Sequence, residues 1–272
     1  MISRRNILSA LAASAAGGCS ARQVAQPAYP YQYPIAPPPP DRASQGLDAV
    51  IDISRSVDVS DFRLVRQSGI LAVVHKASEG GDYADTACAA RRPQAEAAGL
   101  LWGTYHFGTG QWSGAEQAAF FLAASRPGPR TLLALDLEAN ENDPSNSMTL
   151  DQAEAFVQAV ADATGRLPVV YVQPTWANGD PLPNSGLSFG ARITPESILA
   201  RCGLWVADYH DSPEVPLAWA ASGWRLWQYA GDESASNPAY GQTSIVQGVN
   251  HCDRNLFNGD AEALYRFWST GG

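Results

Sequence analysis

Two acidic residues, Asp136 and Glu138, directly follow an apolar run that begins at Leu132. The run predicts a buried β-strand, and residues two apart on a strand point to the same side, with Cα atoms about 6–7 Å apart. Carboxyl groups held so close resist simultaneous ionisation, so one keeps its proton near neutral pH. Cleavage of a glycosidic bond requires such an acid beside a charge. Taken alone, the same pair also occurs where acids merely bind an arginine or cap a helix.

Other strand-like runs share this pattern, apolar at the start and polar at the end. Eight strands are expected at residues 49–54, 71–76, 101–107, 131–138, 168–173, 204–209, 224–229 and 245–257. Their polar ends are Asp52, Lys76, His106, Asp136 with Glu138, Gln173, Asp208, Gln228 and Asp253. Several runs are continuously apolar, which is typical of parallel strands covered on both faces.

Helical patterns separate the early strands. We expect helices at residues 58–67, 86–98, 114–124, 150–163 and 260–268. Thr149 and Gln152 form a capping box for the fourth, and Gly165 ends it. After Pro168 the helical patterns weaken and loops rich in glycine, proline and asparagine take over. This order predicts a (β/α)-barrel whose later units have lost their helices.

In such a barrel the carboxyl ends of the parallel strands open onto one face, where enzymes of this architecture carry their chemistry. The polar strand ends are therefore expected to form one site. Barrel closure places the first and last strands side by side, so Asp52 and Asp253 should share a wall of it.

Composition narrows the function classes. The 272 residues include 45% hydrophobic residues and carry a formal net charge of -9, which argues against nucleic acid as a partner. No glycine-rich phosphate loop, Ser-His-Asp arrangement or metal cluster stands out in the sequence, and the four histidines are scattered, so no cofactor is implied. Apart from Cys19 the cysteines are Cys88, Cys202 and Cys252, for which three buried thiols are the default expectation and one disulfide the maximum.

The N-terminal residues predict an export signal. Residues 1–18 place Arg4 and Arg5 before a short apolar run, too short to span a bilayer, in a pattern similar to a twin-arginine signal. Ala16 to Cys19 resembles a lipobox, with Ala16 where leucine is usual, so Cys19 is the expected lipidation site; simple cleavage is the alternative. Residues 19–45 hold seven prolines and form a linker of roughly 70–80 Å if extended as polyproline. The domain proper is expected over residues 46–272.

Several blocks of the chain resemble glycoside hydrolase family 25, the lysozyme family, in the family's order. They are residues 49–54 (AVIDIS), residues 73–85 (VVHKASEG followed by YAD), residues 97–107 (AAGLLWGTYHF), residues 134–138 (ALDLE), residues 204–209 (LWVADY), residues 226–229 (LWQY) and residues 253–259 (DRNLFNG). Each block is moderately specific, and together they cover most of residues 49–259.

The resemblance implies a single irregular barrel domain of the (β/α)5(β)3 type. It also implies an N-acetylmuramidase that hydrolyses the β-1,4 bond between N-acetylmuramic acid and N-acetylglucosamine in peptidoglycan. In that scheme Glu138 is the general acid, Asp136 stabilises the transition state, and Asp52 and Asp253 support them. The sequence departs from the family at His75, at His251-Cys252 before Asp253, and in the loops at residues 175–192 and 231–242, which look longer than usual.

Substrate-binding candidates surround these acids. They are Tyr105, His106, Lys76, Glu79, Tyr171, Asp208, Tyr209 and Gln228. For Lys76 and Glu79 a mutual ion pair is the favoured interpretation, and for His106 a satisfied histidine at the pocket wall. Aromatic residues near strands are more often core than sugar platforms, so only one or two should meet substrate.

Three hypotheses follow for an exported, monomeric protein of the bacterial periplasm or cell envelope, attached to the membrane only through an N-terminal lipid. The favoured one is a cell-wall muramidase. A hydrolase of another polysaccharide and a non-catalytic wall-binding lipoprotein are the alternatives. The intact Asp52, Asp136 and Glu138 argue against the last, because a binder does not need paired acids.

Overall fold

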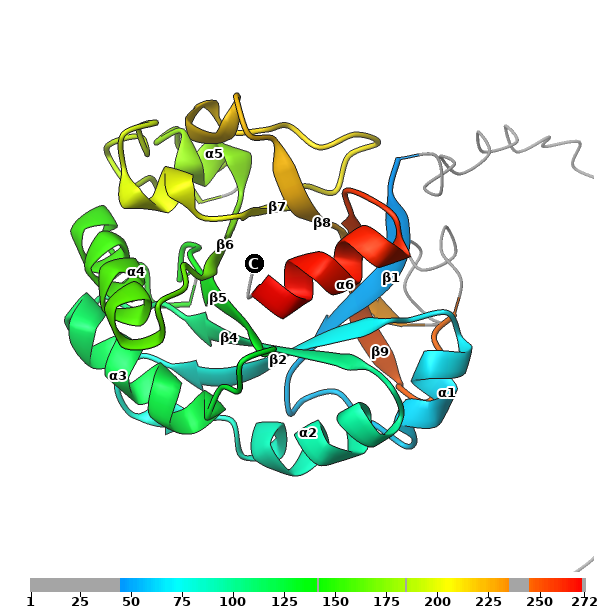
Figure 1. Cartoon of the computed structure of the whole chain (residues 1–272). Helices are drawn as coiled ribbons and strands as arrows, with labels where there is room; N and C mark the ends of the chain where they lie inside the picture. Colours follow the sequence, from blue (N-terminus) through cyan, green and yellow to red (C-terminus); the bar gives the residue numbers. More distant parts are fainter. Residues whose placement is uncertain (1–44, 141, 184, 235–244, 271–272) are drawn as a thin grey trace, which may run out of the picture. The chain divides into compact units, whose positions relative to one another are not determined.

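The computed structural model describes residues 45–270 except 141, 184 and 235–244, and the side chains of 232–234 are also outside the description. The expected signal segment, Cys19 and almost all of the linker therefore lie outside the described residues. Eight strands close into a barrel (Figure 1): β1 (Leu47–Ile53), β2 (Ala72–Glu79), β4 (Leu101–Phe107), β5 (Leu132–Asp136), β6 (Val169–Val172), β7 (Leu204–Ala207), β8 (Trp224–Ser234) and β9 (His251–Phe257). A two-residue strand, β3 (Tyr83–Ala84), pairs antiparallel with the end of β2.

The barrel has a parallel majority and one antiparallel strand. Strands β1, β2 and β4 to β8 pair in parallel, whereas β9 is antiparallel to both β8 and β1. The predicted eight-strand barrel is confirmed. The last strand is shorter than expected and reversed, so Asp253 lies near its beginning rather than at its end. Antiparallel pairing nevertheless brings Asp253 directly opposite Asp52.

Helices cover the first part of the barrel, as the sequence predicted. They are α1 (Phe62–Gln67), α2 (Thr86–Ala97), α3 (Gly114–Ser125), α4 (Leu150–Thr164) and the short α5 (Pro174–Ala177), with α6 (Ala261–Thr270) after the last strand. These elements give five β/α units followed by three strands. Among the described residues, no helix combines the length and apolarity that a membrane span requires.

Local sequence explains how α4 begins and ends. The Thr149 side chain accepts a hydrogen bond from the Gln152 backbone N–H, and the Gln152 side-chain oxygen accepts one from the Thr149 backbone N–H. Gly165 ends the helix at φ 70°, a conformation that glycine adopts without steric cost. The helix packs closely on α3 at Gly114, where an added Cβ would lie 2.0 Å from the Gln152 carbonyl oxygen.

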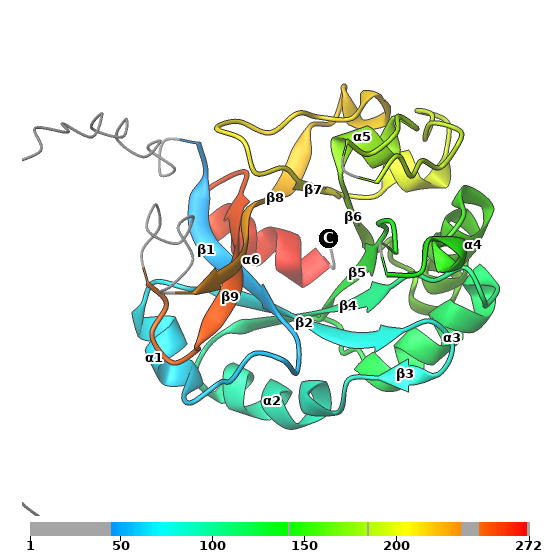
Figure 2. The same cartoon turned by 180° about the vertical axis from the view of Figure 1, so that it is seen from behind.

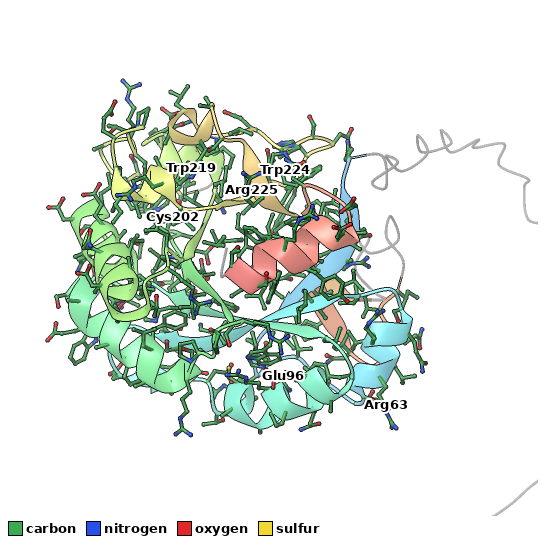
Figure 3. All side chains as sticks on the ribbon, in the orientation of Figure 1. Arg63, Glu96, Cys202, Trp219, Trp224 and Arg225 are labelled. Atoms are coloured by element: carbon green, nitrogen blue, oxygen red, sulfur yellow. The ribbon has the colours of Figure 1, made fainter. Side chains whose placement is uncertain are left out.

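The later part of the barrel wall uses turns where earlier units use helices. Two 3₁₀ turns, η3 (Ile198–Arg201) and η4 (Leu217–Trp219), flank β7. Figure 3 shows Trp219 close to Cys202 in this region, and the Trp219 indole N–H donates to the Cys202 carbonyl at 3.0 Å. Trp219 is fully buried, so one large side chain supplies apolar cover here.

The C-terminal helix α6 lies across one end of the barrel (Figure 1) and behind the strands in the reverse view (Figure 2). Its Trp268 is fully buried among residues of the barrel interior and donates its indole N–H to the Trp102 carbonyl at 2.9 Å. This end is therefore filled by apolar side chains, and the carboxyl ends of the parallel strands remain for the site.

Candidate active site

A pocket of about 110 Å³ lies where the polar strand ends converge. Eight residues line it: Asp52, Tyr105, Asp136, Glu138, Tyr171, Trp205, Gln228 and Asp253. Seven of them come from seven different strands, and Glu138 lies two positions past the end of β5. The four acids that the sequence singled out are therefore together in one cavity.

Asp52 and Asp253 face each other because of strand register. They are direct partners in the β1–β9 ladder. Asp52 is buried and accepts hydrogen bonds from Asn255 Nδ2 at 2.7 Å and from Gln228 Nε2 at 3.1 and 3.2 Å. Gln228 Nε2 also lies 3.4 Å from Asp253 Oδ2. Side-chain amides thus orient this pair of carboxylates.

Gln228 is the centre of this network. The hydroxyls of Tyr171 and Tyr209 both donate to its Oε1, each at 2.8 Å. Burial, followed by nearby carboxylates, raises the pKa of Tyr171 well above the usual 10, so its hydroxyl stays protonated. Two donors on the oxygen side oblige the amide nitrogen of Gln228 to face Asp52 and Asp253. The orientation of the amide is therefore decided by the tyrosines.

Asp136 is a buried acid of the site whose surroundings favour its protonated form. It is 8% exposed, and its Oδ1 is buried with no hydrogen-bond partner among the described residues. Burial in the first place, and then the nearby Glu138 carboxylate, raise the pKa of Asp136 well above 3.8, although Lys76 opposes the shift. Because the charge on either of the Asp136 and Glu138 carboxyls disfavours ionisation of the other, the retained proton belongs to the pair and not to one residue. Glu138 is half-buried and so the more accessible member.

Lys76 and Glu79 form the ion pair that the sequence favoured. Lys76 Nζ lies 2.7 Å from Glu79 Oε2 and 5.0 Å from the centre of the Phe107 ring. Neither residue lines the acid pocket. The contribution of Lys76 there is electrostatic, since its charge lowers the pKa of Asp136.

Two further substrate-binding candidates, His106 and Asp208, also lie outside the lining of the acid pocket. His106 is fully buried and stacks on Phe156 with ring centroids 4.9 Å apart, beneath the helices. Its Nδ1 lies 2.9 Å from Ser78 Oγ and its Nε2 lies 3.1 Å from Gln117 Oε1, and burial lowers its pKa to about 4, so the ring is neutral. The cause is strand alternation: Tyr105 faces the pocket, so its neighbour faces outward.

Asp208 is the second of these candidates. Its carboxylate accepts hydrogen bonds from the Glu214 backbone N–H at 2.8 Å and from the His210 backbone and ring. These contacts stabilise the loop after β7. The neighbouring Tyr209, by contrast, sends its hydroxyl to Gln228, as described above.

Sequence reasoning missed Asn255, which is fully buried and connects Asp52 to Trp205. Its Oδ1 accepts from the Trp205 indole N–H at 2.7 Å while its Nδ2 donates to Asp52. The available signal was spacing, because Asn255 stands two positions after Asp253 and so points to the same face of the strand. In the described part of the chain, no group of three or more His, Cys, Asp or Glu residues is arranged to hold a metal ion.

A β/α-barrel that gathers four carboxyl groups and tyrosines in one pocket defines a class of protein, the barrel glycoside hydrolases. The family model described as Glycosyl hydrolases family 25 matches residues 51–237, and this chain belongs to that family. It is therefore a glycoside hydrolase. The resemblance seen in the sequence blocks is confirmed.

Similar proteins agree with this assignment. Lysozyme M1 of Streptomyces globisporus is 28% identical over 228 residues, which cover 79% of this chain and 69% of that protein. The crystal structure of a bacterial lysozyme from Streptomyces coelicolor is similar with a TM-score of 0.67 and 27% identity, covering 84% of this chain and 99% of that one. A muramidase structure from Acremonium alcalophilum has a TM-score of 0.64 at 28% identity, covering 82% and 98%.

Proposed function

We propose that this protein is a peptidoglycan hydrolase that cleaves the β-1,4 bond between N-acetylmuramic acid and N-acetylglucosamine, with Glu138 as general acid. The observation that carries the proposal is the pocket in which Asp136 and Glu138, a pair that retains a proton, lie together with Asp52 and Asp253. The lysozyme and muramidase relatives support the choice of substrate.

The proposed reaction adds one water molecule across the glycosidic bond. Glu138 gives a proton to the bridging oxygen as the bond from that oxygen to the anomeric carbon breaks. The oxygen of water forms the new bond to the anomeric carbon, and the proton lost by water restores the acid. Glu138 suits the proton transfer because it is the half-buried member of a pair that retains a proton.

The other acids stabilise positive charge at the sugar ring. Asp52 and Asp253 lie against the same pocket, and Gln228 and Asn255 hold the Asp52 carboxylate in place. A fixed negative charge near an oxocarbenium-like centre lowers the barrier without reorganising at the moment of reaction. Asp136 can donate a hydrogen bond while it is protonated, which suits contact with an N-acetyl carbonyl of the substrate.

Release of reducing sugar from purified peptidoglycan tests the proposal. Glu138→Gln should lower the rate by about 10²–10⁴-fold, the usual contribution of a general acid. Glu196→Gln is the matched control, because Glu196 is exposed and outside the pocket. Mass spectrometry of the products should find N-acetylmuramic acid at the new reducing end.

The remaining hypotheses correspond to distinct outcomes. Tight binding to peptidoglycan without release of reducing ends would favour a wall-binding lipoprotein, and turnover of a different glycan alone would favour another polysaccharide as substrate. Unchanged activity of Glu138→Gln would contradict the assigned acid.

We also propose that the protein is exported as a monomer and held at the cell envelope by a lipid on Cys19, with residues 19–45 as spacer. Residues 1–18 and the linker composition support this proposal. Labelling with a fatty-acid analogue and membrane fractionation should show an acylated wild type, and Cys19→Ser should lose both label and membrane association.

A further inference from the structure

His75, one of the positions at which the sequence departs from its family, is fully buried on β2 and contacts α2. Its Nδ1 lies 2.7 Å from the Lys76 carbonyl oxygen, which can only accept, so Nδ1 carries a proton. Its Nε2 lies 3.1 Å from Nη1 of Arg91, and because a guanidinium can only donate, Nε2 is the acceptor. These two contacts require a neutral imidazole in one defined tautomer.

The same guanidinium holds the loop that follows β1, residues 54–60, which we call the β1 loop. Arg91 Nη1 also donates to the Ser54 carbonyl at 2.8 Å, and Arg91 Nη2 donates to the Val57 carbonyl at 2.6 Å. Ser54 stands two positions after Asp52. The Arg91 side chain, oriented by His75, therefore ties the chain just beyond Asp52 to helix α2.

The β1 loop in turn holds the segment that leads into β9. The Asp58 N–H donates to Asn250 Oδ1 at 2.8 Å, and the Asn250 N–H donates to the Asp58 carbonyl at 3.1 Å. The neighbouring residues of the two segments form an antiparallel bridge. Asp253 follows three positions after Asn250. One loop therefore joins the chain beyond Asp52 to the chain before Asp253, and Arg91 is its connection to the helix.

The surroundings of His75 oppose a second proton on its ring. Among the described residues, the charged or titratable groups that face His75 or Arg91 are Asp85 and Cys88 on α2 and Asp58 in the β1 loop. From β4 the neighbour is the uncharged Trp102 ring, whose centroid lies 5.6 Å away. Burial in the first place lowers the pKa of His75 to about 4, and Arg91 adds to this, although the bond to the Lys76 carbonyl and the Asp85 carboxylate oppose the shift.

We propose that His75 and Arg91 are an acid-sensitive pair of positioning residues, which hold the β1 loop, and with it Asp52 and Asp253, while His75 is neutral and release it when His75 is protonated. The release has a simple cause: a proton on Nε2 turns the acceptor of Arg91 into a second donor beside a positive charge. Neither residue lines the acid pocket, so both act through the loop. The effect on turnover rests on the proposed function.

His75→Gln tests the pair, because a glutamine oxygen accepts from Arg91 and does not titrate. At pH 4 about half of the wild-type molecules carry a charged His75. Hydrogen exchange followed by mass spectrometry should then find the amides of Asp58 and Asn250 exchanging about tenfold faster in wild type than in His75→Gln, the equivalent of one lost hydrogen bond to a charged group. At pH 7 the two proteins should exchange these amides at the same rate.

Turnover of purified peptidoglycan by the full-length enzyme gives a second measurement. The kcat of His75→Gln divided by that of wild type should rise from about 1 at pH 7 to about 2 at pH 4 and about 4 at pH 3.5, as the neutral fraction of His75 falls. His106→Gln is the matched control. His106 is equally buried and its pKa is also about 4, but its partners Ser78 and Gln117 lie outside the β1 loop, so this ratio should stay near 1.

Arg91→Met removes the connection at every pH and serves also if His75→Gln does not fold. It should lower kcat at pH 7 by about 10- to 100-fold through misplacement of the acids, and Asp58 and Asn250 should exchange about tenfold faster than in wild type. Arg92→Met is its control, because Arg92 is the next residue of α2 and bonds Glu96 and the Arg126 carbonyl instead.

Equal exchange of the β1 loop in wild type and His75→Gln at pH 4 would overturn the inference. A kcat ratio that stays at 1 down to pH 3.5, or an equal rise for His106→Gln, would overturn it as well. Failure of the wild type to release any reducing sugar would instead overturn the proposed function, and the exchange rates would then decide the role of the pair by themselves.

Discussion

Replacing Asp136 by asparagine should stabilise the protein at neutral pH, although Asp136 lines the proposed active site. Asp136 is buried, and burial followed by Glu138 raises its pKa well above 3.8. Asparagine has the shape of the protonated acid and does not ionise. It therefore tolerates these surroundings at every pH, whereas wild type must keep a proton on a group that would ionise in water. Active-site residues often cost stability in this way.

The pH dependence follows from proton binding. Below pH 3.8 Asp136 is protonated in both the folded and the unfolded chain, so its contribution does not vary. As the pH rises past that value, the unfolded chain releases the proton and the folded chain keeps it. Wild type then loses about 1.4 kcal/mol of unfolding free energy per pH unit until the pH reaches the folded-state pKa. The unfolding free energy of Asp136→Asn minus that of wild type should therefore increase by up to about 1.4 kcal/mol per pH unit.

Urea denaturation followed by tryptophan fluorescence, at about pH 4, 5, 6 and 7, measures this slope. Asp82→Asn is the control, since Asp82 is exposed and its removal should shift the unfolding free energy by a small, nearly constant amount. A variant-minus-wild-type difference that stays flat, or that falls as the pH rises, would mean that Asp136 is ionised in the folded protein. The argument for a retained proton would then fail.

Three further outcomes are expected. Gln228→Leu removes the acceptor of two tyrosine hydroxyls and a donor to Asp52, so urea denaturation should show a loss of about 2–4 kcal/mol, and unchanged activity on peptidoglycan would contradict its orienting role. Gly114→Ala should lower the unfolding free energy by about 1–3 kcal/mol or more, because the added Cβ forces α3 away from α4. Gly128→Ala is the control and should change the melting temperature little, since its added Cβ would come no closer than 3.2 Å to the end of the Arg92 side chain. The cysteines of the described domain, Cys88, Cys202 and Cys252, are buried thiols, and burial raises the pKa of Cys88 and of Cys202 to about 12. Alkylation at about pH 8 followed by peptide mapping should therefore label them only after unfolding. Labelling of any of the three in the native protein would contradict this expectation.

Element order was predictable because each signal is local. The continuous apolar runs gave the parallel strands, and the Thr149 capping box with Gly165 gave the bounds of α4 to within a residue. The first helix shows the limit of this reasoning. It was expected from residue 58 and begins at Phe62, because Val59 pairs with Val249, far along the chain, and Asp61 caps the helix instead. A local pattern cannot reveal a distant pairing.

The site was predictable where the spacing of residues along a strand determines which way their side chains point. Asp136 and Glu138 share a face because they are two apart on a strand, and barrel closure joins Asp52 to Asp253. His106 was expected at the pocket wall, but the alternation that points Tyr105 into the pocket turns His106 outward.

By itself, then, the sequence determined the class of fold, the family and the identity of the paired acids, because these depend on residue type and short-range period. Only the tertiary structure decided three further matters: that β9 is antiparallel to its neighbours, that Gln228 and Asn255 hold Asp52, and that a second cavity adjoins Glu138. Each of these joins residues more than 30 positions apart, and their side chains meet only when barrel closure and strand register fix which atoms are neighbours.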